Sequence, residues 1–158
     1  MGKPIIVETV ETISDKQKVV LTALKTHILE ELGINDPRYD DWYLLRFCIA
    51  RKFKIKDIVK MFENHIKWRT EVGYDNLLIR DSSDLENWKS EHLPTFHSGI
   101  DKFGRPISIH PFGLYNFDNM DTISIEDFCQ IYYTDCAFEI NVVFPYCSKI
   151  AGRRIDKG

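Results

Sequence analysis

Residues 44–73 read LLRFCIARKFKIKDIVKMFENHIKWRTEVG, and they contain two helical patterns joined by a short basic segment. In the first pattern, one helix face carries Leu44, Phe47, Cys48 and Arg51. The arginine therefore shares its face with apolar side chains. A guanidinium in such a place needs a buried partner or an anionic ligand to offset the loss of water.

The second pattern predicts a helix over residues 55–72 that Gly73 ends. Its apolar face carries Ile58, Phe62 and Ile66. Its opposite face carries Lys56, Lys60, Asn64 and Lys67. The separation of apolar and basic side chains is typical of a helix that packs on a core with one side only.

A further helix is predicted before this stretch, over residues 15–32. Ser14 and Gln17 form a capping box at its start, because the hydroxyl accepts from an early amide while the glutamine reaches back. Asp40 or Asp41 is expected to cap the helix that contains Leu44. Three helices with short connections predict a small bundle.

After Gly73 the pattern changes from helices alone to a mixture. A short helix is predicted within residues 81–92, and two extended runs around Asp101-Lys102-Phe103-Gly104 predict a β-hairpin within residues 96–112. A long helix is expected from about Ser124 to Val142, with Pro145 ending or kinking it. The expected fold class is mainly α, followed by α+β.

Composition excludes several classes of protein. The chain has 158 residues, a net charge of −3 and 44% hydrophobic residues, which argues against disorder and against a generally basic nucleic-acid coat. It contains no apolar run long enough for a membrane span, and acidic residues stand where a signal peptide would be apolar. The chain is therefore expected to be unsecreted and cytoplasmic.

Basic residues are concentrated between positions 46 and 69, where eight lysines and arginines face two acids, Asp57 and Glu63. This cluster predicts either a surface that attracts phosphates, of lipid or nucleic acid, or an ordinary solvated helix face. A helical module that binds nucleic acid or a protein partner stays open on this ground. A recognition helix would present arginines and amides together, whereas these lysines are interrupted by glutamate.

Candidate catalytic and metal-binding motifs are weak. Cys147 and Arg153 have the C-x5-R spacing of cysteine phosphatases, but Tyr146 stands where those enzymes place histidine. The four cysteines include no C-x-x-C pair, and the histidines lack metal-ligand spacing. No catalytic residue, metal site or cofactor is predicted, and His65 is expected to serve in packing.

Three segments in order, residues 44–73, GIDKFGRPISI (99–109) and FPYCSKIAG (144–152), resemble the CRAL-TRIO family, and more narrowly its phosphatidylinositol-transfer-protein branch. Similar proteins exchange phosphatidylinositol and phosphatidylcholine, or carry tocopherol or retinoids, without catalysing a reaction. The resemblance implies transient contact with membrane surfaces and no binding of nucleic acid. Arg51 matches the arginine of the family's A-R-K-F phrase, which implies a place near the inositol phosphate.

The resemblance also implies a domain organisation. Residues 1–13 are expected as a flexible arm, residues 14–74 as the helical N-terminal subdomain, and residues 75–158 as part of the α/β lipid-binding domain. The family's central-strand phrase, I-x-D-x-x-G, does not occur in these 158 residues. An incomplete lipid-binding domain is therefore expected, from a fragment or from a shortened gene product.

Overall fold

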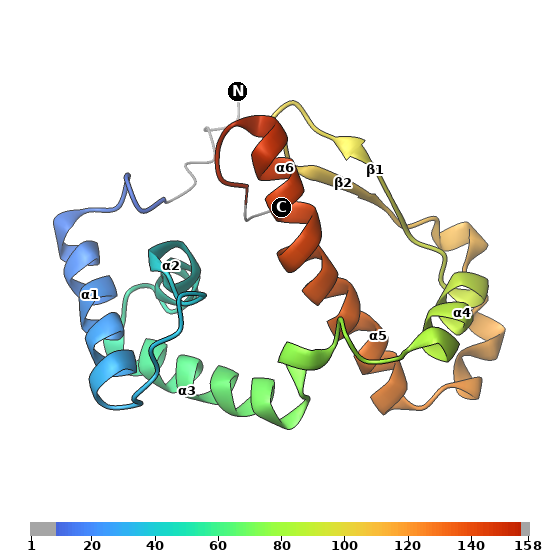
Figure 1. Ribbon diagram of the computed structural model, residues 1–158, viewed down its shortest axis with the longest axis horizontal. Coiled ribbons are helices and arrows are strands. Elements are labelled where there is room, and N and C mark those ends of the chain that lie inside the picture. Colours follow the sequence, from blue (N-terminus) through green and yellow to red (C-terminus); the bar gives the residue numbers. More distant parts are fainter. Residues whose placement is uncertain (1–8, 156–158) are drawn as a thin grey trace. The chain divides into compact units, whose positions relative to one another are not determined.

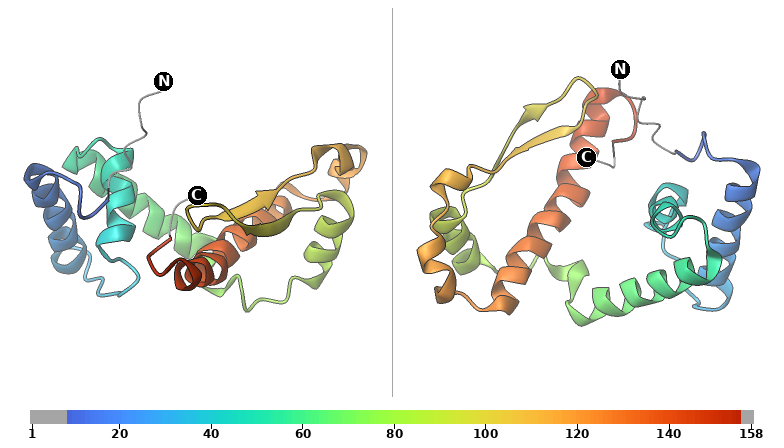
Figure 2. Two further views of the ribbon diagram at one scale, coloured as in Figure 1. Left: turned by 90° about the horizontal axis from the view of Figure 1, so that it is seen from above. Right: turned by 180° about the vertical axis from the view of Figure 1, so that it is seen from behind.

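The computed structural model describes residues 9–155, shown in Figure 1. Contacts along the chain divide it between Glu71 and Val72 into two compact units. We call them the N-terminal unit and the C-terminal unit. Figure 2 shows that the first consists of helices, while the second combines helices with one hairpin.

The N-terminal unit contains the three predicted helices. They are α1 (Asp15–Glu30), α2 (Asp41–Ala50) and α3 (Ile55–Glu71). The capping box of Ser14 and Gln17 is present, and the Asp40 carboxylate accepts from the Tyr43 amide at 2.8 Å. The local sequence therefore begins both helices by satisfying amides that have no partner within the helix.

A continuous apolar core holds α1, α2 and α3 together. Its least exposed side chains are Leu24, Leu45, Cys48, Ile58 and Phe62, each with no accessible surface. Each helix contributes residues spaced by three or four positions, which is the periodicity that the sequence shows. The prediction of a three-helix unit is confirmed.

The segment predicted as an arm, residues 1–13, is described from residue 9 onward. Its first eight positions lie outside the described residues. Ile13 is 4% exposed and belongs to the core, and Val10 packs against that core. The apolar end of this segment is therefore part of the N-terminal unit.

The C-terminal unit combines helical segments with a two-stranded sheet. The helical segments are η1 (Tyr74–Asn76), α4 (Ser83–His92), η2 (Phe112–Leu114), η3 (Phe117–Thr122), α5 (Ile125–Phe138), the π-helical turn η4 (Glu139–Val143) and α6 (Phe144–Ala151). Strands β1 (Phe96–Ile100) and β2 (Pro106–Ile109) pair antiparallel, with Phe96 opposite Ile109. The expected fold class, mainly α and then α+β, is confirmed.

The hairpin turn is closed by one aspartate. The Asp101 carboxylate accepts from the amides of Phe103 and Arg105 at 2.8 and 2.9 Å, and it pairs with the Arg105 guanidinium at 2.7 Å. The hydrogen bond from the Arg105 amide is the main cause that lowers the pKa of Asp101. Local chemistry thus fixes the turn that the sequence predicts.

Of the two outcomes expected at Pro145, an end or a kink of the long helix, the end does not occur. α5 passes through η4 into α6, which continues to Ala151, and Figure 1 shows them as one uninterrupted run. A proline ring clashes with the carbonyl four residues earlier in a regular α-helix. The wider π turn directly before Pro145 changes that geometry, so the helix continues.

None of the helices formed by residues 9–155 combines the length and the apolar character needed to cross a bilayer.

Candidate lipid-binding site

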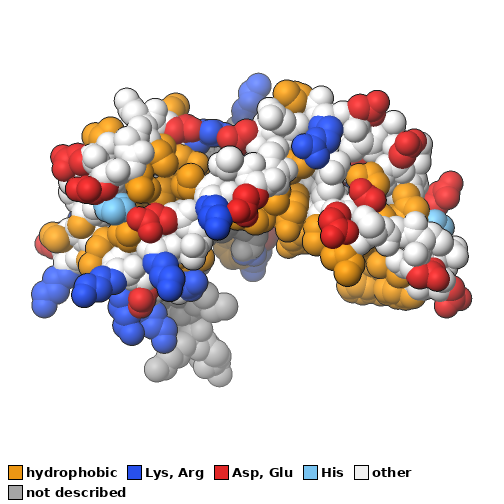
Figure 3. Space-filling view, turned by 90° about the horizontal axis from the view of Figure 1, so that it is seen from below, with side chains coloured by type: hydrophobic (Ala, Val, Ile, Leu, Met, Phe, Trp, Pro, Cys, Tyr) orange, Lys and Arg blue, Asp and Glu red, His pale blue; other side chains and the backbone are white. Residues whose placement is uncertain are grey.

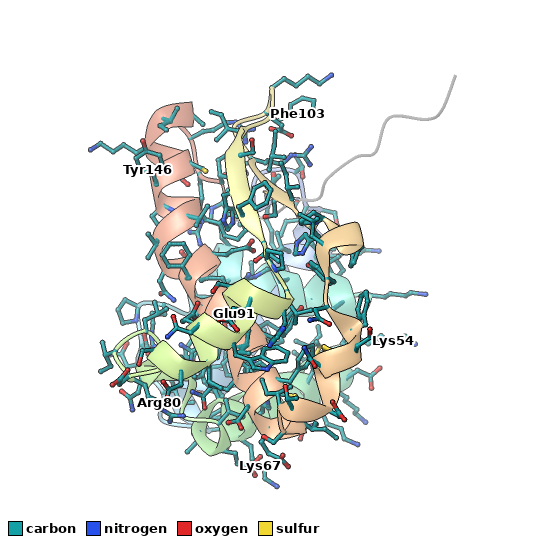
Figure 4. The ribbon with its side chains drawn as sticks, turned by 90° about the vertical axis from the view of Figure 1, so that its right-hand side faces the viewer. Lys54, Lys67, Arg80, Glu91, Phe103 and Tyr146 are labelled. Atoms are coloured by element: carbon teal, nitrogen blue, oxygen red, sulfur yellow. The ribbon has the colours of Figure 1, made fainter. Side chains whose placement is uncertain are left out.

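The C-terminal unit exposes a large amount of apolar surface. In the described part of the chain, only Val19 and Leu29 of the large exposed apolar side chains belong to the N-terminal unit. The most exposed in the C-terminal unit are Ile79, Phe112, Leu114, Ile125 and Tyr146, at 65–82%. Figure 4 labels Tyr146 on α6 and Phe103 at the hairpin tip. Apolar surface on this scale is typical of a binding or interaction face.

A hollow of about 590 Å³ lies in the C-terminal unit among α4, the hairpin and α5. Its apolar lining includes Leu78, Phe96, Tyr132 and Phe138. Its polar lining includes Lys89, His97, Ser108, His110, Asp135 and Glu139. The volume is in the range of small-ligand pockets, and an apolar wall with a few grouped polar atoms is their usual chemistry.

Glu139 is the polar centre of this hollow. One of its carboxylate oxygens accepts from the Ser108 hydroxyl at 3.2 Å and lies 3.2 Å from His97 Nε2. Ser108 and His97 stand opposite each other on the two strands. The carboxylate therefore connects both strands to the helix at the start of the π turn.

Two further contacts hold the elements of this unit together. Within the lining of the hollow, the Lys89 ammonium on α4 pairs with the Asp135 carboxylate on α5. Outside that lining, the Arg153 guanidinium, just after α6, donates to the Phe103 carbonyl at 2.6 Å. Helix α4 is thus attached to α5, and the hairpin tip to the segment after α6.

The sequence reasoning did not identify Glu139, His97 or Ser108 as a cluster. One available signal was an acidic residue inside the apolar run FEINVVF, residues 138–144. A second signal was the nearby Pro145, because π turns recur where a helix is disturbed and often accompany functional sites. Their meeting depends on a hairpin folding back over a helix that follows it by about forty residues.

Arg51, the predicted headgroup residue, lies in the N-terminal unit at the C-cap of α2. Leu44, Phe47 and Cys48 of its predicted stripe are buried, but Arg51 is exposed. The predicted stripe therefore does not continue to Arg51, because α2 ends at Ala50 and the cap residue leaves the helical path. Its guanidinium donates to the Ala50 carbonyl at 3.3 Å.

Cys147 and Arg153, judged a weak phosphatase motif from the sequence, do not form a phosphate-binding loop. Cys147 is buried within α6, where the backbone amides around it are engaged in the helix. Arg153 is occupied by the Phe103 carbonyl. A thiolate nucleophile needs an exposed setting, and this cysteine is buried.

His65 serves in packing, as predicted. Its Nε2 atom lies 2.8 Å from the Tyr43 hydroxyl, and its ring contacts the rings of Phe47 and Trp68. Among the residues that the structure describes, no three histidine, cysteine or acidic side chains gather as metal ligands would.

Comparison with protein families adds to this geometry. Residues 9–64 match the CRAL/TRIO, N-terminal domain. The matched residues run from just before α1 into α3, so this domain corresponds to most of the N-terminal unit. The resemblance predicted from the sequence is confirmed.

Individual relatives extend the similarity into the C-terminal unit. Phosphatidylinositol/phosphatidylcholine transfer protein SFH12 of Arabidopsis thaliana is 30% identical over 99% of this chain, which covers 29% of the relative. The SEC14 cytosolic factor of Candida glabrata is 30% identical over 90% of this chain and 47% of its own length. The Sec14 cytosolic factor of Schizosaccharomyces pombe is 29% identical over 91% of this chain and 50% of its own length. The chain thus spans about a quarter to a half of the length of these curated relatives.

Proposed function

We propose that this chain binds phospholipid and acts in transferring it between membranes, as a carrier and not as an enzyme. The proposed ligands are phosphatidylinositol and phosphatidylcholine, and the proposed location is the cytoplasm, with peripheral membrane contact. The names of the relatives SFH12 and Sec14 cytosolic factor support this proposal.

The observation that carries the proposal is the apolar surface of the C-terminal unit around its hollow. Acyl chains are removed from water only where apolar groups surround them. Phe96, Tyr132 and Phe138 border the hollow and are 44–63% exposed, as expected of a wall that awaits a ligand or a cover. Lipid transfer by the 158 residues alone is therefore proposed to be weak unless another segment or molecule covers this face.

Arg51 is proposed to contact the phosphate of an inositol headgroup. Its exposure at the end of α2 leaves the guanidinium fork accessible to an anion, and arginine binds phosphate through paired hydrogen bonds. A charge-assisted contact of this kind is worth about 1.5–3 kcal/mol. Phosphatidylcholine has the same phosphodiester beside a choline cation, so the preference for the net-anionic phosphatidylinositol is expected to be at most roughly a tenfold to hundredfold effect.

The test is lipid capture by the whole chain from vesicles that contain equal amounts of phosphatidylinositol and phosphatidylcholine. Bound lipid is extracted from the re-isolated protein and quantified by mass spectrometry. Arg51→Ala is expected to lower captured phosphatidylinositol while sparing phosphatidylcholine. Lys67→Ala is the matched control, since it removes an exposed cation of α3 whose ion pair with Glu71 is also exposed.

Equal loss of both lipids in Arg51→Ala would contradict the headgroup role. Capture of neither lipid by the unaltered chain, even at high vesicle concentration, would contradict lipid binding itself. Recovery of a tocopherol or a retinoid in place of phospholipid would change the proposed ligand.

A further inference from the structure

The turn between α2 and α3 and the first turns of α3 form an unusually basic surface. Between residues 51 and 60 the sequence carries five cations and a single carboxylate, Asp57. We call the four lysines of this segment, Lys52, Lys54, Lys56 and Lys60, the lysine surface. All four are exposed, and Figure 3 shows lysine and arginine side chains gathered on one side of the N-terminal unit.

The four lysines of the lysine surface lack ion pairs, unlike several other cations of the same unit. Lys18, Lys25, Arg38 and Lys67 each pair with a carboxylate. Within residues 9–155, none of the four lysines of the lysine surface forms such a pair. Their charge is therefore not neutralised by the described part of the chain.

The backbone beneath this surface is in a costly conformation. Lys52 and Phe53 have φ angles of 50° and 58°, and two successive residues with side chains rarely adopt the left-handed region. Lys54 and Lys56 also stand at the N-terminal end of α3, where the helix dipole disfavours positive charge. Conformational strain and unfavourable charge at one place are features that folded proteins keep mainly where they serve binding.

The form of the turn indicates what kind of anion it meets. The amides of Lys52, Phe53 and Lys54 donate to the carbonyls of Ile49, Cys48 and Arg51. These three amides are thus not available to cradle a single phosphate. Lysines act as separate, mobile point charges and suit a surface with many anionic groups.

We propose that the lysine surface docks the protein on the anionic face of a lipid bilayer. The inference rests on the proposed function, because it names the surface by which the carrier reaches its membrane. It is distinct from the headgroup role of Arg51, which requires one lipid in a defined place. Since the whole chain has a net charge of −3, attraction to an anionic bilayer depends on such a local surface.

The experiment is sedimentation of the whole chain with vesicles of phosphatidylcholine alone or mixed equally with phosphatidylserine. The test variant is Lys54→Gln/Lys56→Gln/Lys60→Gln. The control variant is Lys16→Gln/Lys67→Gln/Lys149→Gln, which removes the same charge from exposed positions elsewhere. Circular dichroism of all three proteins verifies that helix content is unchanged.

Unaltered protein is expected to bind the phosphatidylserine vesicles more tightly, and binding is expected to fall as salt is raised. Each lysine near the bilayer contributes roughly a fivefold change, so the test variant is expected to lose on the order of a hundredfold in affinity. The control variant is expected to lose far less. Equal losses in the two variants, or no preference for phosphatidylserine, would overturn the proposal.

Two further measurements distinguish bilayer docking by the lysine surface from the headgroup role of Arg51 and from nucleic-acid binding. Arg51→Ala is expected to keep most vesicle binding, so a failed headgroup role and a failed docking surface give different results. Titration with duplex DNA at the same salt is expected to show weaker binding than to the vesicles. Tighter binding to DNA, lost in the test variant, would assign the lysine surface to nucleic acid and overturn the bilayer proposal.

Discussion

At the residue scale, Cys48 shows how packing determines the chemistry of a side chain. Its thiol lies in the core of the N-terminal unit with no exposed surface, and burial raises its pKa to about 11. Thiolate, and not thiol, is the reactive form of cysteine. At pH 8 roughly one thiol in a thousand would be ionised at such a pKa.

Alkylation of the native chain with iodoacetamide at pH 8 is therefore expected to be at least about tenfold slower at Cys48 than at the partly exposed Cys129. Mass spectrometry of peptides over a time course measures both rates in one sample. In denaturant the two rates are expected to converge. Equal rates in the native chain would show that Cys48 is not buried as described.

Lys56 offers a second prediction at this scale, because its charge opposes the dipole of α3. Lys56→Glu places a carboxylate in the first turn of the helix and is expected to raise the free energy of unfolding by about 0.3–1 kcal/mol. The same change is expected to weaken binding to phosphatidylserine vesicles. Lys67→Glu, near the other end of α3, is the control and is expected to destabilise the helix slightly. Urea denaturation measures the free energy of unfolding of both variants. A lower value in Lys56→Glu would contradict the inference that the charge of Lys56 is unfavourable at the start of α3.

At the element scale, the hairpin depends on a single glycine where its turn meets α6. Gly104 has a φ of 78°, and a Cβ atom there would lie 2.7 Å from the Ala151 Cβ. The turn is otherwise held by Asp101, and its tip is held by the hydrogen bond from Arg153 to the Phe103 carbonyl. Conformation and close approach thus both require glycine at this position.

Gly104→Ala is expected to destabilise the C-terminal unit by about 1–3 kcal/mol, from left-handed strain and overpacking combined. Gly99→Ala is an informative control, since its φ of 77° brings similar strain but nothing lies within 4 Å of the added methyl group. Thermal denaturation of both variants separates the two causes. Equal losses would show that the contact with Ala151 adds nothing.

At the scale of the whole molecule, the two units differ in how completely they bury their apolar residues. The N-terminal unit has a continuous core of residues from α1, α2 and α3. In the C-terminal unit, the described buried residues are few: Tyr74, Leu77, Ile131, Ala137, Cys147 and Ile155. Stability within one chain follows local burial, so the two units are expected to open independently.

Amide hydrogen exchange of the whole chain is expected to be slowest in α1–α3, between Leu21 and Phe62, and clearly faster in β1 and β2. Vesicles that contain phosphatidylinositol are expected to slow exchange in the C-terminal unit more than in the N-terminal core. Mass spectrometry of peptides with and without vesicles measures both effects. Uniform fast exchange from Leu44 to Phe62 would contradict the three-helix core.

The sequence alone determined the features that depend on neighbours within one or two helical turns. The capping box at Ser14, the helix periodicity around Phe62 and the turn at Asp101 are such features, because their hydrogen bonds and apolar contacts join residues close in the chain. The phrase that begins at Leu44 also resembles the family whose N-terminal domain matches residues 9–64. Strong local signals act in the same way whatever the rest of the chain does.

Only the tertiary structure decided the rest. Periodicity placed Arg51 with Leu44 and Cys48, but the helix ends one residue earlier and its cap conformation exposes the side chain. No local sequence pattern predicts the π turn before Pro145. The same holds for the contact of Glu139 with His97, which lies 42 positions away in the chain. The physical reason is that a helix end, a widened turn and a hollow between elements depend on how distant segments pack. The balance between backbone strain and apolar burial at such places is not encoded in any short stretch of sequence.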